Sequence, residues 1–232
     1  MQMKPEAGIV VLFDVDNTLL DNDAVQHDLS ELLASELGPA GRDRYWSIFE
    51  ALRDEVGYAD YLGSLQRYRL EVPQESRLPR VSTFLLEYPF ASRVYPGALA
   101  AIARLQRLGP TVILSDGDVV MQPRKIRRSG LGEAVSGRVL IYIHKEQMLD
   151  AVARAYPARH YVMVDDKLRI LTALKRHWGS SVTTIFPRQG RYAHDAAELS
   201  ANPPADLTID GIGELASYDI GHLPSIQAYH RE

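Results

Sequence analysis

The alternation of short apolar runs with longer amphipathic runs constrains the fold more than any other feature of this sequence. A short, continuous apolar run is typical of a strand that is buried on both faces, as in a parallel sheet covered by helices. We therefore expect an α/β fold with a doubly wound, mostly parallel sheet. The predicted strands are residues 8–13, 111–114, 138–143, 161–164, 182–186 and 207–209.

The segments between these strands have the periodicity of amphipathic helices. Leu99, Ile102 and Leu105 recur at helical spacing, and Gly109-Pro110 ends that run, as expected where a helix stops. Strands and helices therefore alternate along most of the chain. Helices are predicted between the strands at residues 97–108, 119–129, 145–156 and 168–178.

Residues 21–93 interrupt this alternation, because they contain helix-period stretches and no convincing strand. Leu29 and Leu33 lie on one helical face, and Gly38-Pro39 is expected to end that helix. We expect two domains: a core formed by residues 1–20 and 94–232, and a helical domain, residues 21–93, inserted after the first strand. Further helices are predicted within the insertion at residues 45–56, 58–70 and 81–88.

Composition and charge exclude several classes of function. The 232 residues contain no cysteine, which excludes disulfides, thiolate metal sites and cysteine nucleophiles. The net charge of −4 provides no basic field for a nucleic-acid backbone. No apolar run approaches the roughly 18 residues of a membrane span, and the first residues lack the apolar stretch of a signal peptide. We expect a cytoplasmic protein without a nucleic-acid or membrane partner.

Two carboxylates and a hydroxyl directly follow the first predicted strand, at Asp14, Asp16 and Thr18. In open α/β sheets, ligands bind at the carboxyl ends of the strands. Two neighbouring carboxylates repel each other, and a hard divalent ion such as Mg²⁺ would stabilise them. A polar turn after a core strand is the alternative interpretation. The five apolar residues before Asp14 and the threonine after it favour a functional site.

This segment resembles the first motif of the haloacid dehalogenase superfamily, whose phosphatase branch carries Asp-x-Asp-x-Thr after the first strand. The resemblance implies a Rossmann-like core and three further features: a serine or threonine ending the next core strand, a lysine at the start of a helix, and one or two acids ending a later strand. Ser115, Lys145 and the pair Asp165-Asp166 occur in that order. Each motif is weak by itself, and the ordered set is specific.

The resemblance also implies roles for these residues. Asp14 is expected to attack phosphorus and form an aspartyl phosphate. Asp16 would protonate the leaving group and then activate the water that hydrolyses this intermediate. Ser115, Asp116 and Lys145 are expected to bind the substrate phosphate, although Ser115 could instead cap the following helix.

The cofactor implied by the resemblance is Mg²⁺. Its expected ligands are Asp14, Asp16 through the backbone carbonyl, and Asp165, with Asp166 as a further candidate. Adjacent acids differ from the commoner family pattern, in which glycine precedes the first acid and the second follows some residues later. Whether Asp166 joins the metal site therefore stays open.

Several residues have a competing interpretation. Lys125 is the alternative to Lys145, but residues 123–128 have the pattern of a solvated cationic helix face, whereas Lys145 directly follows a strand, so we favour Lys145. Other aromatic and arginine residues are more typical of packing and surface than of a site. These residues are Tyr58, Tyr61, Arg67, Tyr68, Arg69, Arg188 and Arg191.

Together these patterns predict a Mg²⁺-dependent phosphomonoester hydrolase that acts on a small organophosphate. Dehalogenases of the resembled superfamily lack an aspartate at the position of Asp16, because a departing halide needs no proton. The inserted helices are expected to form a mobile cap over the site. A phosphomutase on the same core, or a non-catalytic protein that binds a phosphorylated ligand, remains an alternative.

Overall fold

A computed structural model of the chain describes residues 6–222 and residue 226, and its strands form one six-stranded parallel sheet. The strand order is β3-β2-β1-β4-β5-β6, which is the order of the doubly wound Rossmann fold. All six predicted strands are confirmed, and the predicted bounds differ by three residues at most. The strands are β1 (Ala7–Phe13), β2 (Thr111–Asp116), β3 (Val139–Tyr142), β4 (Ala158–Val164), β5 (Val182–Pro187) and β6 (Leu207–Ile209).

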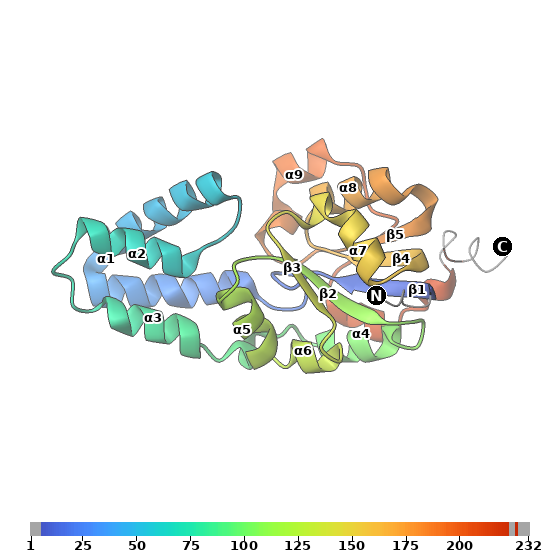
Figure 1. Cartoon of the computed structure of the whole chain (residues 1–232), viewed down its shortest axis with the longest axis horizontal. Helices are drawn as coiled ribbons and strands as arrows, with labels where there is room; N and C mark the ends of the chain where they lie inside the picture. Colours follow the sequence, from blue (N-terminus) through green and yellow to red (C-terminus); the bar gives the residue numbers. More distant parts are fainter. Residues whose placement is uncertain (1–5, 223–225, 227–232) are drawn as a thin grey trace.

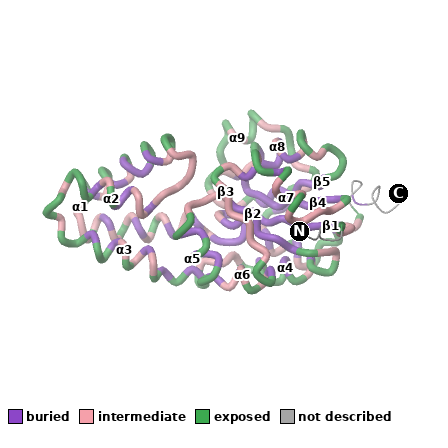
Figure 2. The backbone as a smooth tube through the Cα atoms, in the orientation of Figure 1, coloured by how far each residue is buried: buried purple, intermediate pink, exposed green. Residues whose placement is uncertain are grey.

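Helices cover both faces of this sheet (Figure 1). Alternate residues of β1 point to opposite faces, so Val11 and Phe13 belong to one buried cluster and Val10 and Leu12 to the other. The first face is covered by α4 (Ala98–Leu105), α5 (Met121–Arg128) and α6 (Leu131–Ala134), and the second by α7 (Leu149–Ala155) and α8 (Leu168–Trp178). Figure 2 shows the resulting buried layer along the strands.

The inserted residues form three helices that extend from one end of the α/β body (Figure 1). They are α1 (Asn22–Val56), α2 (Tyr61–Glu71) and α3 (Leu78–Glu87). The predicted helix end at Gly38-Pro39 is a kink within α1, where Gly38 adopts φ 79° and ψ 167°. A second helical segment begins directly after it, since proline is well accommodated in a first helical turn.

The chain leaves and re-enters the α/β body at adjacent points. The Asp21 amide donates to the Arg93 carbonyl at 2.8 Å, and the Tyr95 amide donates to the Leu19 carbonyl at 2.9 Å. The insertion therefore begins and ends beside the loop that carries Asp16 and Thr18.

Shorter segments complete the described residues. No helix in residues 6–222 is long and apolar enough to cross a membrane. The predicted core includes residues 1–5, 223–225 and 227–232, which lie outside the described part of the chain. The remaining elements are α9 (Ala196–Ala201) and the 3₁₀ helices η1 (Phe90–Arg93), η2 (Lys145–Gln147), η3 (Gly179–Ser181), η4 (Arg191–His194), η5 (Ile212–Ala216) and η6 (Ile220–His222).

Candidate active site

Parallel pairing brings three separate motifs to one edge of the sheet. Phe13 pairs with Ile113 on one side and with Val164 on the other, so Asp14, Ser115 and Asp165 all follow at the carboxyl ends of neighbouring strands. Asp14 continues this pairing, because its amide donates to the Val164 carbonyl at 3.0 Å.

Asp14, Asp165 and Asp166 form a buried carboxylate cluster. One oxygen from each residue lies within 4.8 Å of the others, and both carboxylate oxygens of Asp166 have no hydrogen-bond partner. An unpaired charge in a buried position is costly. Three convergent carboxylates are the oxygen donors that a hard divalent cation prefers. These residues therefore fit a metal ion, and the structure brings Asp166 together with the other two acids.

Lys145 supplies the positive charge that contacts two acids of the cluster directly. Its buried Nζ lies 2.5 Å from Asp14 Oδ1 and 2.6 Å from Asp165 Oδ2. Lys145 belongs to η2, so the helix predicted over residues 145–156 is divided into η2 and α7. The side chain of Asp116 accepts the Lys145 backbone N–H at 2.7 Å and so fixes the segment that carries this lysine.

Burial and charge shift the pKa values of the clustered groups in different directions. Burial would raise the pKa of Asp14, but the nearby charges of Lys145 and Lys167 outweigh it and the pKa is lowered. Burial, despite the opposing charge of Lys145, raises the pKa of Asp165 to about 6. Burial also raises the pKa of Asp166 well above its ordinary value. Asp14 is thus held as a carboxylate, whereas for Asp166 burial outweighs the stabilising charge of Lys167.

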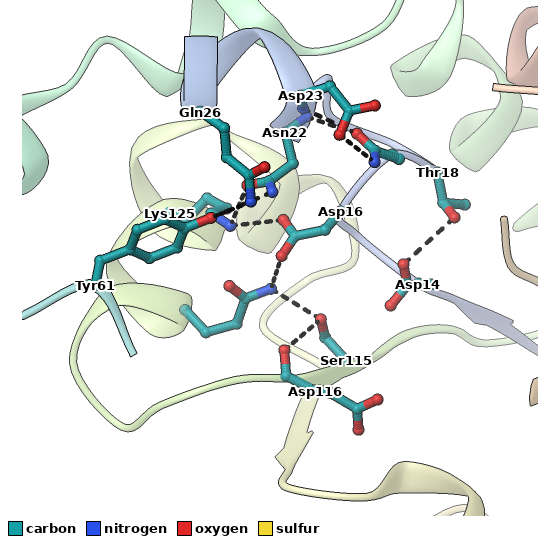
Figure 3. Close-up of polar contacts among 12 residues, drawn as sticks. Asp14, Asp16, Thr18, Asn22, Asp23, Gln26, Tyr61, Ser115, Asp116 and Lys125 are labelled. Carbon is teal, nitrogen blue, oxygen red and sulfur yellow. Dashed lines mark hydrogen bonds and ion pairs between the residues drawn. The ribbon is translucent and has the colours of Figure 1, made fainter. Parts of the chain in front are cut away.

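Thr18 and Asn17 organise the loop after β1. The Thr18 hydroxyl accepts the Asp166 amide at 3.0 Å. It also lies 3.4 Å from Asp14 Oδ2 (Figure 3). Asn17 adopts φ 61°, a left-handed conformation that asparagine tolerates better than most residues. Its side-chain oxygen accepts the amides of Asn22 and Asp23 at 3.0 and 3.1 Å, so this loop also fixes the start of α1.

The side chain of Asp16 lies outside the three-carboxylate cluster and contacts α5 instead. Lys125 Nζ lies 2.6 Å from Asp16 Oδ1 and 3.0 Å from Asn22 Oδ1 (Figure 3). Gln122 Nε2 donates to Ser115 Oγ at 2.9 Å and lies 3.5 Å from Asp16 Oδ2. Ser115 is therefore bound to a buried side chain, and its hydroxyl makes no contact typical of a helix cap among those described.

The prediction that Lys125 lies on a solvated helix face is wrong. Lys125 is 2% exposed, whereas Arg127 on the same helix is exposed. Met121, Gln122, Lys125 and Ile126 form the buried face of α5. Their helical spacing could have identified Lys125 as an inward-facing residue, but the surrounding arginines obscured that pattern.

A cavity of 320 Å³ lies between the inserted helices and the sheet edge, with Asp16 and Asp116 in its lining. Tyr58 and Tyr61 of the insertion also line it, so the packing and surface role favoured for them does not keep them out of the pocket. Arg191 lines the cavity too, which corrects its assignment to the outer surface. The other residues assigned to packing and surface, namely Arg67, Tyr68, Arg69 and Arg188, lie outside this lining.

Comparison with known proteins identifies the family. A sequence profile of haloacid dehalogenase-like hydrolases matches residues 10–177, which contain the described carboxylate cluster and Lys145. The chain belongs to the haloacid dehalogenase-like hydrolases. A search of curated proteins found no significant match.

This haloacid dehalogenase-like hydrolase is similar to several solved structures. A protein of Burkholderia xenovorans LB400 assigned to the same hydrolases is 64% identical over 92% of this chain and 97% of its own, with a TM-score of 0.88. The hydrolase YfnB of Bacillus subtilis, bound to magnesium, is 16% identical over 90% of this chain and 97% of its own, with a TM-score of 0.58. The L-2-haloacid dehalogenase of Xanthobacter autotrophicus with chloropropionic acid covalently bound is 16% identical over 89% of this chain and 96% of its own, with a TM-score of 0.59. The last two comparisons establish a shared fold.

We expect Asp166→Asn to raise the thermal unfolding midpoint of the metal-free protein by about 3–6 °C, because it removes a carboxyl group that has no hydrogen-bond partner and whose ionisation burial opposes. The same change should reduce the rise in midpoint that Mg²⁺ produces. Differential scanning fluorimetry with and without Mg²⁺ measures both effects. Asp150→Asn, which changes an acid exposed by 77%, is the matched control. A lower metal-free midpoint for Asp166→Asn would contradict this view of the cluster.

Proposed function

We propose that this hydrolase is a Mg²⁺-dependent phosphomonoesterase that acts on a small organophosphate through an aspartyl phosphate on Asp14. The observation that supports this most strongly is the placement of Asp16. Its carboxyl group lines the cavity and is held by Lys125 beside the buried Asp14–Lys145 pair. An alkoxide leaving group needs a proton and a halide does not, so an acid at this position favours phosphate esters.

In the first half-reaction, the Asp14 carboxylate attacks phosphorus while the bond to the leaving oxygen breaks. Asp16 gives its proton to that oxygen. Lys145 holds Asp14 in place and offers its charge to the phosphoryl oxygens, and Ser115 provides a hydroxyl donor. A divalent ion held by Asp14, Asp165, Asp166 and the Asp16 carbonyl would screen the charge of the phosphate from that of the nucleophile.

In the second half-reaction, Asp16 accepts a proton from water, and the water oxygen attacks phosphorus. The bond between phosphorus and Asp14 then breaks, which releases inorganic phosphate and restores the starting carboxylate. One residue thus serves as acid and then as base, and no proton is left unassigned.

We further propose that residues 21–93 act as the cap of this site. Arg53 of α1, Tyr61 of α2 and Tyr58 of the loop between them line the cavity, so ligand binding would engage both parts of the chain. Enclosure of this kind excludes water and selects the leaving group. A cavity of 320 Å³ is at the small end of ligand pockets, which favours a small molecule as substrate.

The decisive experiment measures the products released from a panel of phosphomonoesters and from 2-chloropropionate. We expect Mg²⁺-dependent release of inorganic phosphate, a fall to background after chelation with EDTA, and recovery when Mg²⁺ is restored. Release of chloride without release of phosphate would instead indicate a dehalogenase. Transfer of phosphate within the substrate would indicate a mutase. Phosphate binding without turnover of any ester would indicate a non-catalytic protein.

A further inference from the structure

The loop after β5 reaches the cavity and is fixed there by polar contacts. The Gln189 side-chain amide donates to the Thr18 carbonyl at 2.9 Å, and its oxygen accepts the Ile212 amide at 2.6 Å. The Arg191 amide donates to Asp23 Oδ2 at 2.7 Å. This loop is therefore anchored to the segment that follows the nucleophile.

Gly190 allows the loop to approach this closely. Its φ is 65°, and a Cβ at this position would lie 2.5 Å from the Asn17 side chain. A residue with a side chain would have to move away from Asn17 or adopt a strained backbone. The position of Arg191, the next residue, is thus determined by the backbone and not only by its own side chain.

The guanidinium group of Arg191 lies at the cavity without a close carboxylate partner. Its nearest described polar contacts are 3.3 Å to Tyr192, 3.4 Å to Gln26 and 3.9 Å to Asp23, all longer than usual N–H···O hydrogen bonds. By contrast, Arg188 on the same loop pairs closely with Asp210, with its Nε at 2.9 Å. Donors of Arg191 are therefore available to a ligand.

Two further arginines from different elements line the same cavity. Arg53 comes from α1 and Arg169 from α8. Arg53 is paired with Glu50 at 2.6 Å, but the distance from Arg169 to Glu146 is 4.0 Å. Cations in the lining of a cavity favour an anionic ligand there. Lys145 and the carboxylate-bound metal ion would already serve the transferred phosphoryl group, so these outer arginines suit another anion.

We propose that Arg191 binds a second anionic group of the substrate, a carboxylate or a second phosphate, carried by the leaving group. This inference rests on the proposed phosphomonoesterase function and narrows its substrate class to small phosphorylated acids. A guanidinium fork matches both anions bidentately, and Tyr58 and Tyr61 line the same cavity.

The test uses pairs of esters that differ by one anionic group. Glycerol 3-phosphate and 3-phosphoglycerate differ by a carboxylate, and fructose 6-phosphate and fructose 1,6-bisphosphate differ by a phosphate. In the wild type, the KM of the more acidic member of at least one pair should be lower. Arg191→Gln should raise that KM about 10- to 100-fold more than the KM of its less acidic partner. Arg191→Lys should retain part of the preference, and Arg188→Gln, which removes a cation outside this cavity, is the matched control.

Equal effects of Arg191→Gln on both members of each pair, or no preference in the wild type, would overturn the proposal. Calorimetric binding of the same esters to the Asp14→Asn variant separates recognition from turnover. A preference for the acidic ester in binding, without hydrolysis by the wild type, would support the second-anion site and refute the proposed function. Hydrolysis of both members of a pair without a preference would support the proposed function and refute the second-anion site.

Discussion

Asp14→Asn should lower kcat for phosphate release by about 10³-fold or more, because an amide cannot form the phosphorylated intermediate. The substitution is close to isosteric, and Lys145 keeps its contact of 2.6 Å with Asp165. It also takes from buried Lys145 one of its two carboxylate partners, so the metal-free protein should unfold at a somewhat lower temperature while staying folded at the assay temperature. Steady-state kinetics and thermal unfolding on the same preparation separate loss of the nucleophile from loss of the fold.

A direct readout of the intermediate strengthens this experiment. Intact-mass spectrometry after acid quench should detect a phosphorylated wild-type chain during turnover and none in Asp14→Asn. Asp150→Asn, on the exposed side of α7, should behave as the wild type. Retention of full activity by Asp14→Asn would rule out covalent catalysis at this residue.

Lys125→Met should lower kcat/KM for an alkyl phosphate by about 10²-fold, which is the lower part of the range expected for loss of acid–base catalysis. The physical reason is positional: Lys125 is the close cationic partner of Asp16, at 2.6 Å. Without it, the only polar side chain described beside the acid is Gln122 at 3.5 Å, which orients it less firmly toward the leaving oxygen. For p-nitrophenyl phosphate the fall should be much smaller, because p-nitrophenolate departs without protonation. kcat/KM reports the steps up to phosphoenzyme formation, where this difference arises.

The dependence on leaving group separates positioning from general damage to the fold. Lys125→Arg should recover part of the activity with the alkyl phosphate, and Asp16→Asn should show the same dependence on leaving group as Lys125→Met. Arg127→Met is the matched control, because it removes an exposed cation from the same helix. An equal fall with both substrates would show that Lys125 supports the structure without orienting Asp16.

The strands and the main motifs could be predicted because their signals are contiguous in sequence. A strand buried on both faces is a short apolar run, and the carboxyl ends of β1, β2 and β4 place Asp14, Ser115 and Asp165 at one edge. The helix kink at Gly38 and the division of residues 145–156 into η2 and α7 were less predictable. Such features depend on how a helix packs against its neighbours more than on its own periodicity.

The partners of Asp16 and the lining of the cavity could not be predicted in the same way. Lys125 lies 109 positions from Asp16 in sequence, and Arg191 reaches the cavity through Gly190, which packs on Asn17. Both assignments depend on which face of an element is buried and on which loops meet.

The positions of the strands along the chain, and the acids that follow them, were encoded locally in this sequence. Hydrophobic periodicity and short motifs need only neighbouring residues. The pairing of Asp16 with Lys125, the joining of Asp166 to the carboxylate cluster and the entry of Arg191 into the cavity were decided by the tertiary structure. The physical reason is that charge–charge and hydrogen-bond energies depend on distance and burial in space, and separation along the chain specifies neither.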